Sequence, residues 1–215
     1  MLLLAVIIIT DVTAQSWSGK WISTMENQSA SNSWMAYRKH VTADNIPAAA
    51  IARIAADSKY WLWINGKQVV FEGGLKRGPN ALDTYYDTVN IAPYLQKGEN
   101  TIAVLLWYFG KDGFSHKSSG RAGLIFDCTS GDLQINSDKT WKCAVLPAYQ
   151  TAGAPFPNFR LPEPSILYDA RIAPLRWQEN NYDDKWMPSA MELGVAGSYP
   201  WNKLHPRPIP MWKDE

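Results

Sequence analysis

Residues 60–74, YWLWINGKQVVFEGG, contain the motif that decides the fold. Asn65-Gly66 is the strongest short-range signal for a β-hairpin, because both residues tolerate the positive φ angles of a type I′ turn. Residues 60–64 and 67–71 are therefore the expected arms. Side chains alternate along a strand, so the two tryptophans of the first arm share one face, and its tyrosine, leucine and isoleucine share the other. One face meets the core and the other meets a second layer or a ligand. The sequence leaves open which is which.

Short runs rich in Val, Ile, Trp, Tyr and Ala extend from residue 35 to residue 146 and are separated by turn residues. We expect further strands at residues 49–56, 85–89, 101–108, 121–128, 132–137 and 140–146. The run at 101–108 is continuously apolar, as is typical of a strand that is covered on both faces. About eight strands in two sheets indicate an all-β domain, a jelly roll or a related β-sandwich.

The composition agrees with this class of fold. The 215 residues are 46% hydrophobic, 13% aromatic and 19% charged, and 14 Gly and 14 Pro supply many turns. The formal net charge is +1, from 21 Lys and Arg against 20 Asp and Glu. No basic run is present that would neutralise a row of phosphates, which argues against nucleic acid as a partner.

The chain divides into four parts by texture. Residues 1–14 begin with the apolar run MLLLAVIIIT, which is too short to span a bilayer of about 30 Å. Val12 and Ala14 occupy the small-residue positions that a signal peptidase reads, so cleavage is expected after Ala14, with export to the periplasm or the medium and no membrane association afterwards. Because no Lys or Arg precedes the run, a buried first strand is the alternative.

Residues 15–146 form the expected β-sandwich domain. Residues 147–205 are rich in proline, which central strands do not accept, and we expect an ordered C-terminal arm that packs on or extends the sandwich. Residues 206–215, within HPRPIPMWKDE, are an extended proline-rich segment and are expected to be a linker without secondary structure.

Cys128 and Cys143 lie on strands that we expect to be neighbours, and an exported protein can form a disulfide between them. Two buried thiols that behave as small hydrophobic side chains are the alternative. Their spacing includes no partner His or Cys for a metal site.

The order of several motifs resembles the amino-terminal β-sandwich region of bacterial α-L-rhamnosidases, the inverting enzymes of glycoside hydrolase family 78. The likeness runs from about residue 21 to residue 212 and rests on RKHVT, the N-G hairpin, GLKRGPN to YYDT, APYLQKGENTIAV, YDAR, YDDKW and RPIP. The hairpin and the APYLQKGENTIAV segment are shared by many galactose-binding-like sandwiches, including those that lead β-galactosidases. The GLKRGPN, YDAR and RPIP blocks are the parts that indicate rhamnosidases.

The resemblance implies a non-catalytic role for this chain. In that family an (α/α)₆ barrel after the sandwiches carries the reaction, and this chain stops before such a barrel begins. Glycoside inversion requires two carboxylates roughly 6.5–9.5 Å apart, one with a raised pKa. The acidic residues here are interpreted as turn formers without that pairing: Asp57, Asp87, Glu99 and Asp138. We therefore expect no catalytic residue, with the missing barrel as partner and a rhamnose-containing glycan as its substrate.

Other chemistry has little support in the sequence. His40, His116 and His205 are far apart, and there is no phosphate loop and no G-x-S-x-G, so neither a metal nor a cofactor is expected. NNYDDKW, residues 180–186, offers oxygen ligands for calcium, but a turn before an inserted Trp186 is the preferred interpretation.

Sugar contact is the remaining possibility, because it needs aromatic faces together with a few polar side chains. Two loops, at residues 77–86 and 107–116, contain this mixture. The candidate carbohydrate-binding residues are Arg77, Tyr86, Trp107, Tyr108, Phe114 and His116. Tyr85 and Tyr86 point to opposite faces, so at most one of them meets a given ligand. Trp63 and Trp107 are interpreted first as core or domain-interface residues.

Two other functions stay open at this point. The chain is either a complete, secreted carbohydrate-binding module, or the leading sandwich of a β-galactosidase-like enzyme. The RGPN and RPIP blocks count against the second of these.

Overall fold

The computed structural model describes residues 16–26, 28–74, 78–114, 116–154 and 160–212. The expected signal peptide, residues 1–14, lies outside this range. The described residues form β-strands and one 3-10 turn, η1 (Ala92–Tyr94). The strands are β1 (Lys20–Ser23), β2 (Ser33–Ala43), β3 (Ile51–Asp57), β4 (Lys59–Ile64), β5 (Lys67–Gly73), β6 (Thr84–Asn90), β7 (Gly98–Tyr108), β8 (Gly123–Ser130), β9 (Leu133–Asn136), β10 (Lys142–Val145), β11 (Tyr149–Thr151), β12 (Ile166–Tyr168), β13 (Met191–Val195) and β14 (Leu204–Pro206).

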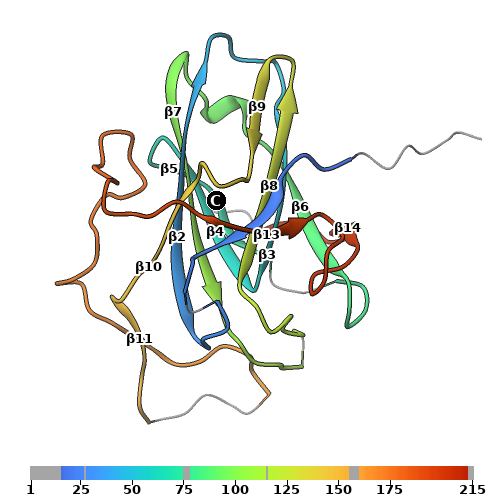
Figure 1. Ribbon diagram of the computed structural model, residues 1–215, viewed down its shortest axis with the longest axis vertical. Coiled ribbons are helices and arrows are strands. Elements are labelled where there is room, and N and C mark those ends of the chain that lie inside the picture. The colour runs from blue at the N-terminus through green and yellow to red at the C-terminus, as the bar shows by residue number, and fades with distance from the viewer. Residues whose placement is uncertain (1–15, 27, 75–77, 115, 155–159, 213–215) are drawn as a thin grey trace, which may run out of the picture.

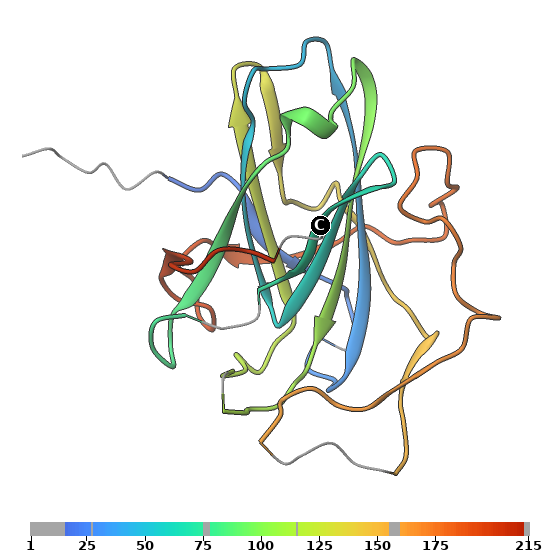
Figure 2. The ribbon, with the colours of Figure 1, turned by 180° about the vertical axis from the view of Figure 1, so that it is seen from behind.

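Two sheets pack face to face as a β-sandwich, which confirms the expected fold class (Figure 1). The seven-stranded sheet has the order β13-β1-β8-β3-β6-β14, with β9 paired to β8, and the five-stranded sheet has the order β10-β2-β7-β4-β5. β11 and β12 form a separate two-stranded ribbon. Figure 2 shows from behind that the arm containing this ribbon lies outside the five-stranded sheet.

The N-G hairpin forms as the sequence predicts. β4 and β5 pair antiparallel. The turn that joins them consists of Asn65 and Gly66, whose φ angles are 53° and 79°. The alternation along β4 is also resolved. Tyr60, Leu62 and Ile64 are buried in the core between the sheets, while the two tryptophans pack against a second apolar cluster on the outer face.

β7 is the central strand of the five-stranded sheet, between β2 and β4. Its inward residues belong to the main core and are Ile102, Val104, Leu106 and Tyr108. Its outward residues, Ala103, Leu105 and Trp107, are buried in the outer cluster. The continuous apolar run in the sequence is thus explained by a strand that is covered on both faces.

The C-terminal arm covers the outer face of the five-stranded sheet and then crosses to the other sheet. Trp177 and Met187 are buried against that outer face. β13 then pairs with β1, and β14 pairs parallel to β6 at the opposite edge of the seven-stranded sheet. The proline-rich arm therefore does enter a sheet, but only at its edges, where a missing N–H is tolerated.

Residues 206–215 were expected to be a linker without secondary structure, and this expectation is wrong for Pro206. Pro206 belongs to β14, and the next residue, Arg207, is anchored in the sandwich. Its Nη2 donates to Asp87 Oδ2 at 2.8 Å, its Nε lies 2.5 Å from Asp87 Oδ1, and Tyr60 Oη donates to the same carboxylate at 2.7 Å. Asp87 is therefore a buried strand residue that pairs with Arg207, and its interpretation as a turn former is also wrong.

The cysteines are not on neighbouring strands. Cys128 lies on β8 of the seven-stranded sheet and Cys143 on β10 of the five-stranded sheet, and both thiols are free and buried. The expected disulfide is thus absent, because the chain order of these strands does not match their order in space. Burial raises the pKa of Cys128 to about 11, which leaves its thiol protonated and unreactive near neutral pH.

Candidate carbohydrate-binding site

The aromatic residues at the end of β7 serve the packing of the sandwich. Trp107 stacks on Trp34 with ring centroids 4.6 Å apart, and its Nε1 donates to Asn32 Oδ1 at 2.8 Å. Trp34 also stacks on Tyr149, at 4.2 Å. Tyr108 is 1% exposed and faces the main core. Both proposed sugar contacts on this strand are therefore enclosed by protein.

The loop after β7 brings His116 into the interior. His116 Nε2 lies 3.4 Å from Asp57 Oδ1, both side chains are buried, and neither ring nitrogen makes a hydrogen bond with the described residues. Burial alone would raise the pKa of Asp57, but His116 and the Ser119 N–H, which donates at 2.6 Å, outweigh it, so the pKa is lowered. Asp57 thus faces His116 and the Ser119 N–H at the end of β3 rather than serving as a simple turn former.

Phe114 is the candidate of this loop that faces solvent. Its side chain is 83% exposed, with the Arg160 guanidinium 5.4 Å from the ring centroid. Arg77 lies outside the described residues. Tyr86 lies on β6 of the seven-stranded sheet, whereas Trp107 and Tyr108 belong to the five-stranded sheet. The structure therefore does not bring the described candidates together into one site.

Tyr86 is surrounded by residues that the sequence did not single out. Its ring packs edge-on against Trp17 at 5.2 Å, and the Arg53 guanidinium lies 4.3 Å from the Trp17 ring centroid. Both rings are half-buried on the outer face of the seven-stranded sheet. No local motif marks Trp17 or Arg53, because strand pairing and the N-terminal segment bring them to Tyr86 from distant parts of the chain.

Arg53 and Asp127 form the polar centre of this surface. Arg53 Nη2 donates to Asp127 Oδ1 at 2.8 Å and to the Ser16 carbonyl at 2.8 Å. The other carboxylate oxygen accepts from the backbone N–H groups of Ser18 at 2.5 Å and Gly19 at 2.9 Å. This ion pair is buried, so it fixes the segment that carries Trp17 beside Tyr86.

Two clefts adjoin Arg53 and Tyr86. The first, here called the central cleft, has a volume of about 540 Å³ and a rim that includes Ser18, Thr88, Thr129 and Ser130. The second, the lateral cleft, has a volume of about 370 Å³ and is completed by Trp17, Gly197 and Lys203.

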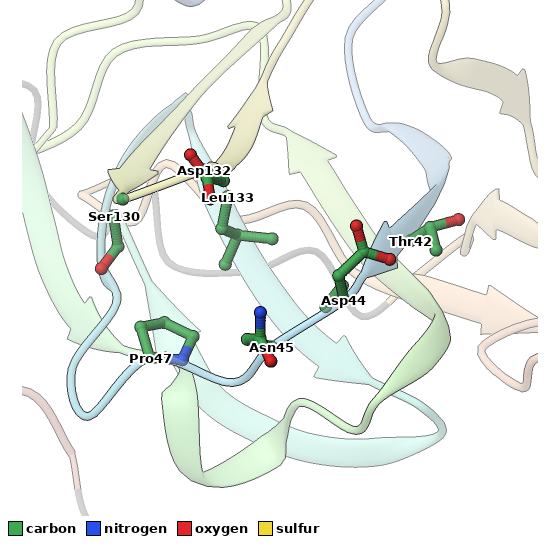
Figure 3. Close-up of a pocket in the computed structure, with 9 residues that line it drawn as sticks. Thr42, Asp44, Asn45, Pro47, Ser130, Asp132 and Leu133 are labelled. Atoms are coloured by element: carbon green, nitrogen blue, oxygen red, sulfur yellow. The ribbon is translucent and has the colours of Figure 1, made fainter.

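A third hollow, the end pocket, lies at one end of the sandwich and has a volume of about 300 Å³. Figure 3 shows Asp44 and Asn45, from the loop after β2, across the pocket from Ser130 and Asp132 at the turn between β8 and β9. The end pocket has no aromatic lining and shares Ser130 with the central cleft.

The NNYDDKW segment has a structural role in the arm. Asp184 Oδ2 accepts from Arg38 Nε at 3.0 Å and lies 3.0 Å from His40 Nε2. Burial alone would raise the pKa of Asp184, but the hydrogen bonds and charges of Arg38 and His40 outweigh burial, so the net effect is a lowered pKa. Among the residues that the structure describes, no group of three or more His, Cys, Asp or Glu side chains is placed to hold a metal ion. No helix in the same part of the chain is long and apolar enough to cross a membrane.

Comparison with known proteins identifies the relatives of this sandwich. The family model described as the α-L-rhamnosidase N-terminal domain matches residues 45–207. A family 78 rhamnosidase from Bacillus sp. GL1 is similar over 92% of this chain and 20% of its own, with 29% identity and a TM-score of 0.82. An α-L-rhamnosidase from Dictyoglomus thermophilum is 21% identical over 91% of this chain and 23% of its own, with a TM-score of 0.65.

A lectin from Pleurotus ostreatus, solved in complex with GalNAc, shares the fold at 19% identity and a TM-score of 0.56, over 88% of this chain and 48% of its own. No curated protein matches the sequence. The chain thus spans 20–23% of the length of the first solved rhamnosidases that it matches.

Proposed function

The chain belongs to the α-L-rhamnosidase N-terminal domain family, and from this premise we propose that it serves as the non-catalytic amino-terminal module of a larger, exported rhamnosidase. The full-length enzyme would remove terminal α-L-rhamnose from glycans. The observation that carries the proposal is the family match over residues 45–207, together with a likeness that extends over 20% of a solved rhamnosidase. The acidic residues of the sandwich support a non-catalytic role, because Asp57 and Asp87 are buried and paired with His116 and Arg207.

The proposed partner is the (α/α)₆ catalytic barrel of the same enzyme, and the arm offers a surface for it. Six large apolar side chains of the arm are each 37–72% exposed, and three of them lie on β12. They are Leu161, Ile166, Leu167, Tyr168, Ile172 and Leu175. A domain that packs against the β11–β12 ribbon would remove this apolar surface from water.

Export rests on the sequence of residues 1–14. The test is intact-mass analysis of the chain after expression in a bacterium with a working secretion system. A mature protein that begins at Gln15 supports export, and retention of the first 14 residues in the cytoplasm contradicts it.

Activity measurements test the main proposal. The DNA that follows the codon for Glu215 is sequenced, and the longest continuous product is expressed beside the 215-residue chain. We expect the long product to hydrolyse p-nitrophenyl α-L-rhamnoside and the 215-residue chain to release no nitrophenol. A stop codon followed by unrelated sequence, or hydrolysis by the short chain, contradicts the proposal.

A stand-alone carbohydrate-binding module is the second candidate. The clefts beside Tyr86 favour it, since they combine aromatic rings with hydroxyl groups. Such a module would bind sugar and remain monomeric without any partner domain. The leading sandwich of a β-galactosidase-like enzyme is not retained, because the family match is to rhamnosidases.

A further inference from the structure

We propose that the end pocket, the central cleft and the lateral cleft form one groove that binds a neutral oligosaccharide from one end of the sandwich along the outer face of the seven-stranded sheet. The inference rests on the proposed function for the biological source of the sugar, and its geometry stands independently. In the full-length enzyme the groove would hold a part of the glycan remote from the bond that is cleaved.

Neighbouring hollows share lining residues, and this sharing is the basis for joining them into one groove. Ser130 lines both the end pocket and the central cleft, and Arg53 and Tyr86 line both the central and the lateral cleft. The path therefore runs from the β8–β9 turn, across β3 and β6, to the loop before β14. An elongated groove of this kind suits a chain of several sugar rings better than a single ring.

Tyr86, which lines both the central and the lateral cleft, and Trp17, which lines the lateral cleft, supply the aromatic contact along this path. Their edge-to-face packing, with an interplanar angle of 87°, leaves each ring half-buried, so each has surface that faces outward. Aromatic surface of this kind packs against the C–H face of a pyranose, while the hydroxyls at the ring edge turn to polar neighbours.

The polar groups of the groove match a neutral ligand. Arg53 and Asp127 neutralise each other and are held by the Ser16 carbonyl and two backbone N–H groups. The rest of the central rim consists mainly of hydroxyls, those of Ser16, Ser18, Thr88, Thr129 and Ser130. An excess of positive charge would favour phosphate or uronic acid, and this groove has none, since Asp44 and Asp132 at one end oppose Lys203 at the other.

The ion pair also prepares the site before the ligand arrives. Arg53 is fixed between Asp127 and the face of Trp17, so the aromatic platform is held in position without the ligand. Binding then costs little ordering of protein side chains, which favours measurable affinity for a weakly interacting sugar.

The test begins with the full chain on an array of immobilised neutral and uronic-acid-containing oligosaccharides, followed by calorimetric titration with the best neutral glycan at increasing chain length. We expect retention on neutral glycans and affinity that rises from the monosaccharide to longer chains. Tyr86→Ala should weaken binding by roughly two- to tenfold. Tyr85→Ala, on the opposite face of the same strand, is the matched control and should leave affinity unchanged.

A second variant guards against a folding artefact. Thr88 is exposed on the rim, so Thr88→Trp fills the central cleft without removing a core contact, and it should abolish binding while the thermal midpoint stays close to that of the wild type. Three outcomes would each contradict the proposed oligosaccharide groove. They are binding of anionic glycans only, no binding to any glycan, and equal affinity for the wild type and Thr88→Trp. None of these outcomes bears on whether a catalytic domain follows Glu215, so the two proposals fail separately.

Discussion

The two outer faces of the sandwich use similar residues in opposite ways. On the five-stranded sheet the arm covers a cluster that includes Trp34, Trp107 and Trp177, and no described candidate there is open to a ligand. On the seven-stranded sheet the later segment covers only part of the face, where Trp201 stacks on Trp21, and Trp17 and Tyr86 stay half-buried beside open clefts. Aromatic richness in a sequence therefore does not indicate a sugar site by itself. The deciding factor is whether a later segment of the chain covers the face.

The largest expected effect on stability comes from detaching the arm from the outer face of the five-stranded sheet. Arg38 is fully buried and holds the arm through Asp184 and the carbonyls of Trp177 and Glu179. Arg38→Ala leaves these acceptors without their donor, and we expect a loss of about 3–5 kcal/mol in the free energy of unfolding. Urea denaturation measures it, and limited proteolysis should show cleavage in the arm.

Arg176→Ala is the matched control for Arg38→Ala. The Arg176 side chain is 76% exposed and pairs with Glu179 at 2.7 Å, so its removal should change stability by no more than about 1 kcal/mol. Equal losses in the two variants would mean that the arm is not held by the buried arginine.

The equivalent change on the open face should cost less. Asp127→Asn keeps the shape of the side chain but removes the charge that accepts from Arg53, Ser18 and Gly19. We expect a loss of about 1.5–3 kcal/mol by urea denaturation, with increased mobility of Trp17 seen as a change in tryptophan fluorescence anisotropy. Asp132→Asn, at an exposed turn, serves as the control. If the stability of Asp127→Asn equals that of the wild type, the Arg53–Asp127 pair does not hold Trp17 in position, and the groove is not pre-organised.

The junction between the two sheets should respond to pH. Asp57 ends β3, and its pKa is lowered in the folded chain, so the folded state is stabilised above the ordinary pKa of about 3.9. This stabilisation is lost as the pH falls through the lowered pKa, because the unfolded state then binds more protons. Denaturation curves from pH 7 to pH 2 should therefore show a smaller pH dependence in Asp57→Asn than in the wild type. Parallel profiles would contradict the assignment.

The smallest effect on stability is expected at the proposed domain interface. Leu175 is 72% exposed on the arm, so Leu175→Glu should change the free energy of unfolding by no more than about 0.5 kcal/mol. The same change should reduce self-association of the isolated chain, measured by light scattering after size-exclusion chromatography. Lys185→Glu, at a 91% exposed polar side chain, is the control for added charge alone.

Local patterns were sufficient for much of the sandwich. Asn65-Gly66, the alternation along β4 and the continuous apolar run of β7 each depend on neighbours within a few residues, and each was predicted correctly. β1, with only four residues, has no such pattern and was not predicted. The eleven-residue β2 was also not given bounds, because its outer end mixes charged and apolar residues.

The candidate site depended on contacts that no local pattern records. Trp107 was interpreted first as a core or interface residue, and it is buried in the outer cluster against Trp34. His116 was a candidate on a polar loop, and it is buried beside Asp57. Trp17 and Arg53 were missed because their meeting with Tyr86 requires the pairing of β3 with β6 and the anchoring of the N-terminal segment by Asp127. The two cysteines were misplaced for the same reason, since β8 and β10 are close in the chain but lie in different sheets.

β14 also protects the sandwich from aggregation. An uncovered strand edge presents free N–H and C=O groups that template the addition of another chain. β14 covers that edge of β6, and its last residue, Pro206, is followed by Pro208 and Pro210; none of these prolines has an N–H to offer. A proline-rich end that resembles a simple linker in the sequence thus closes one edge of the seven-stranded sheet against further strands.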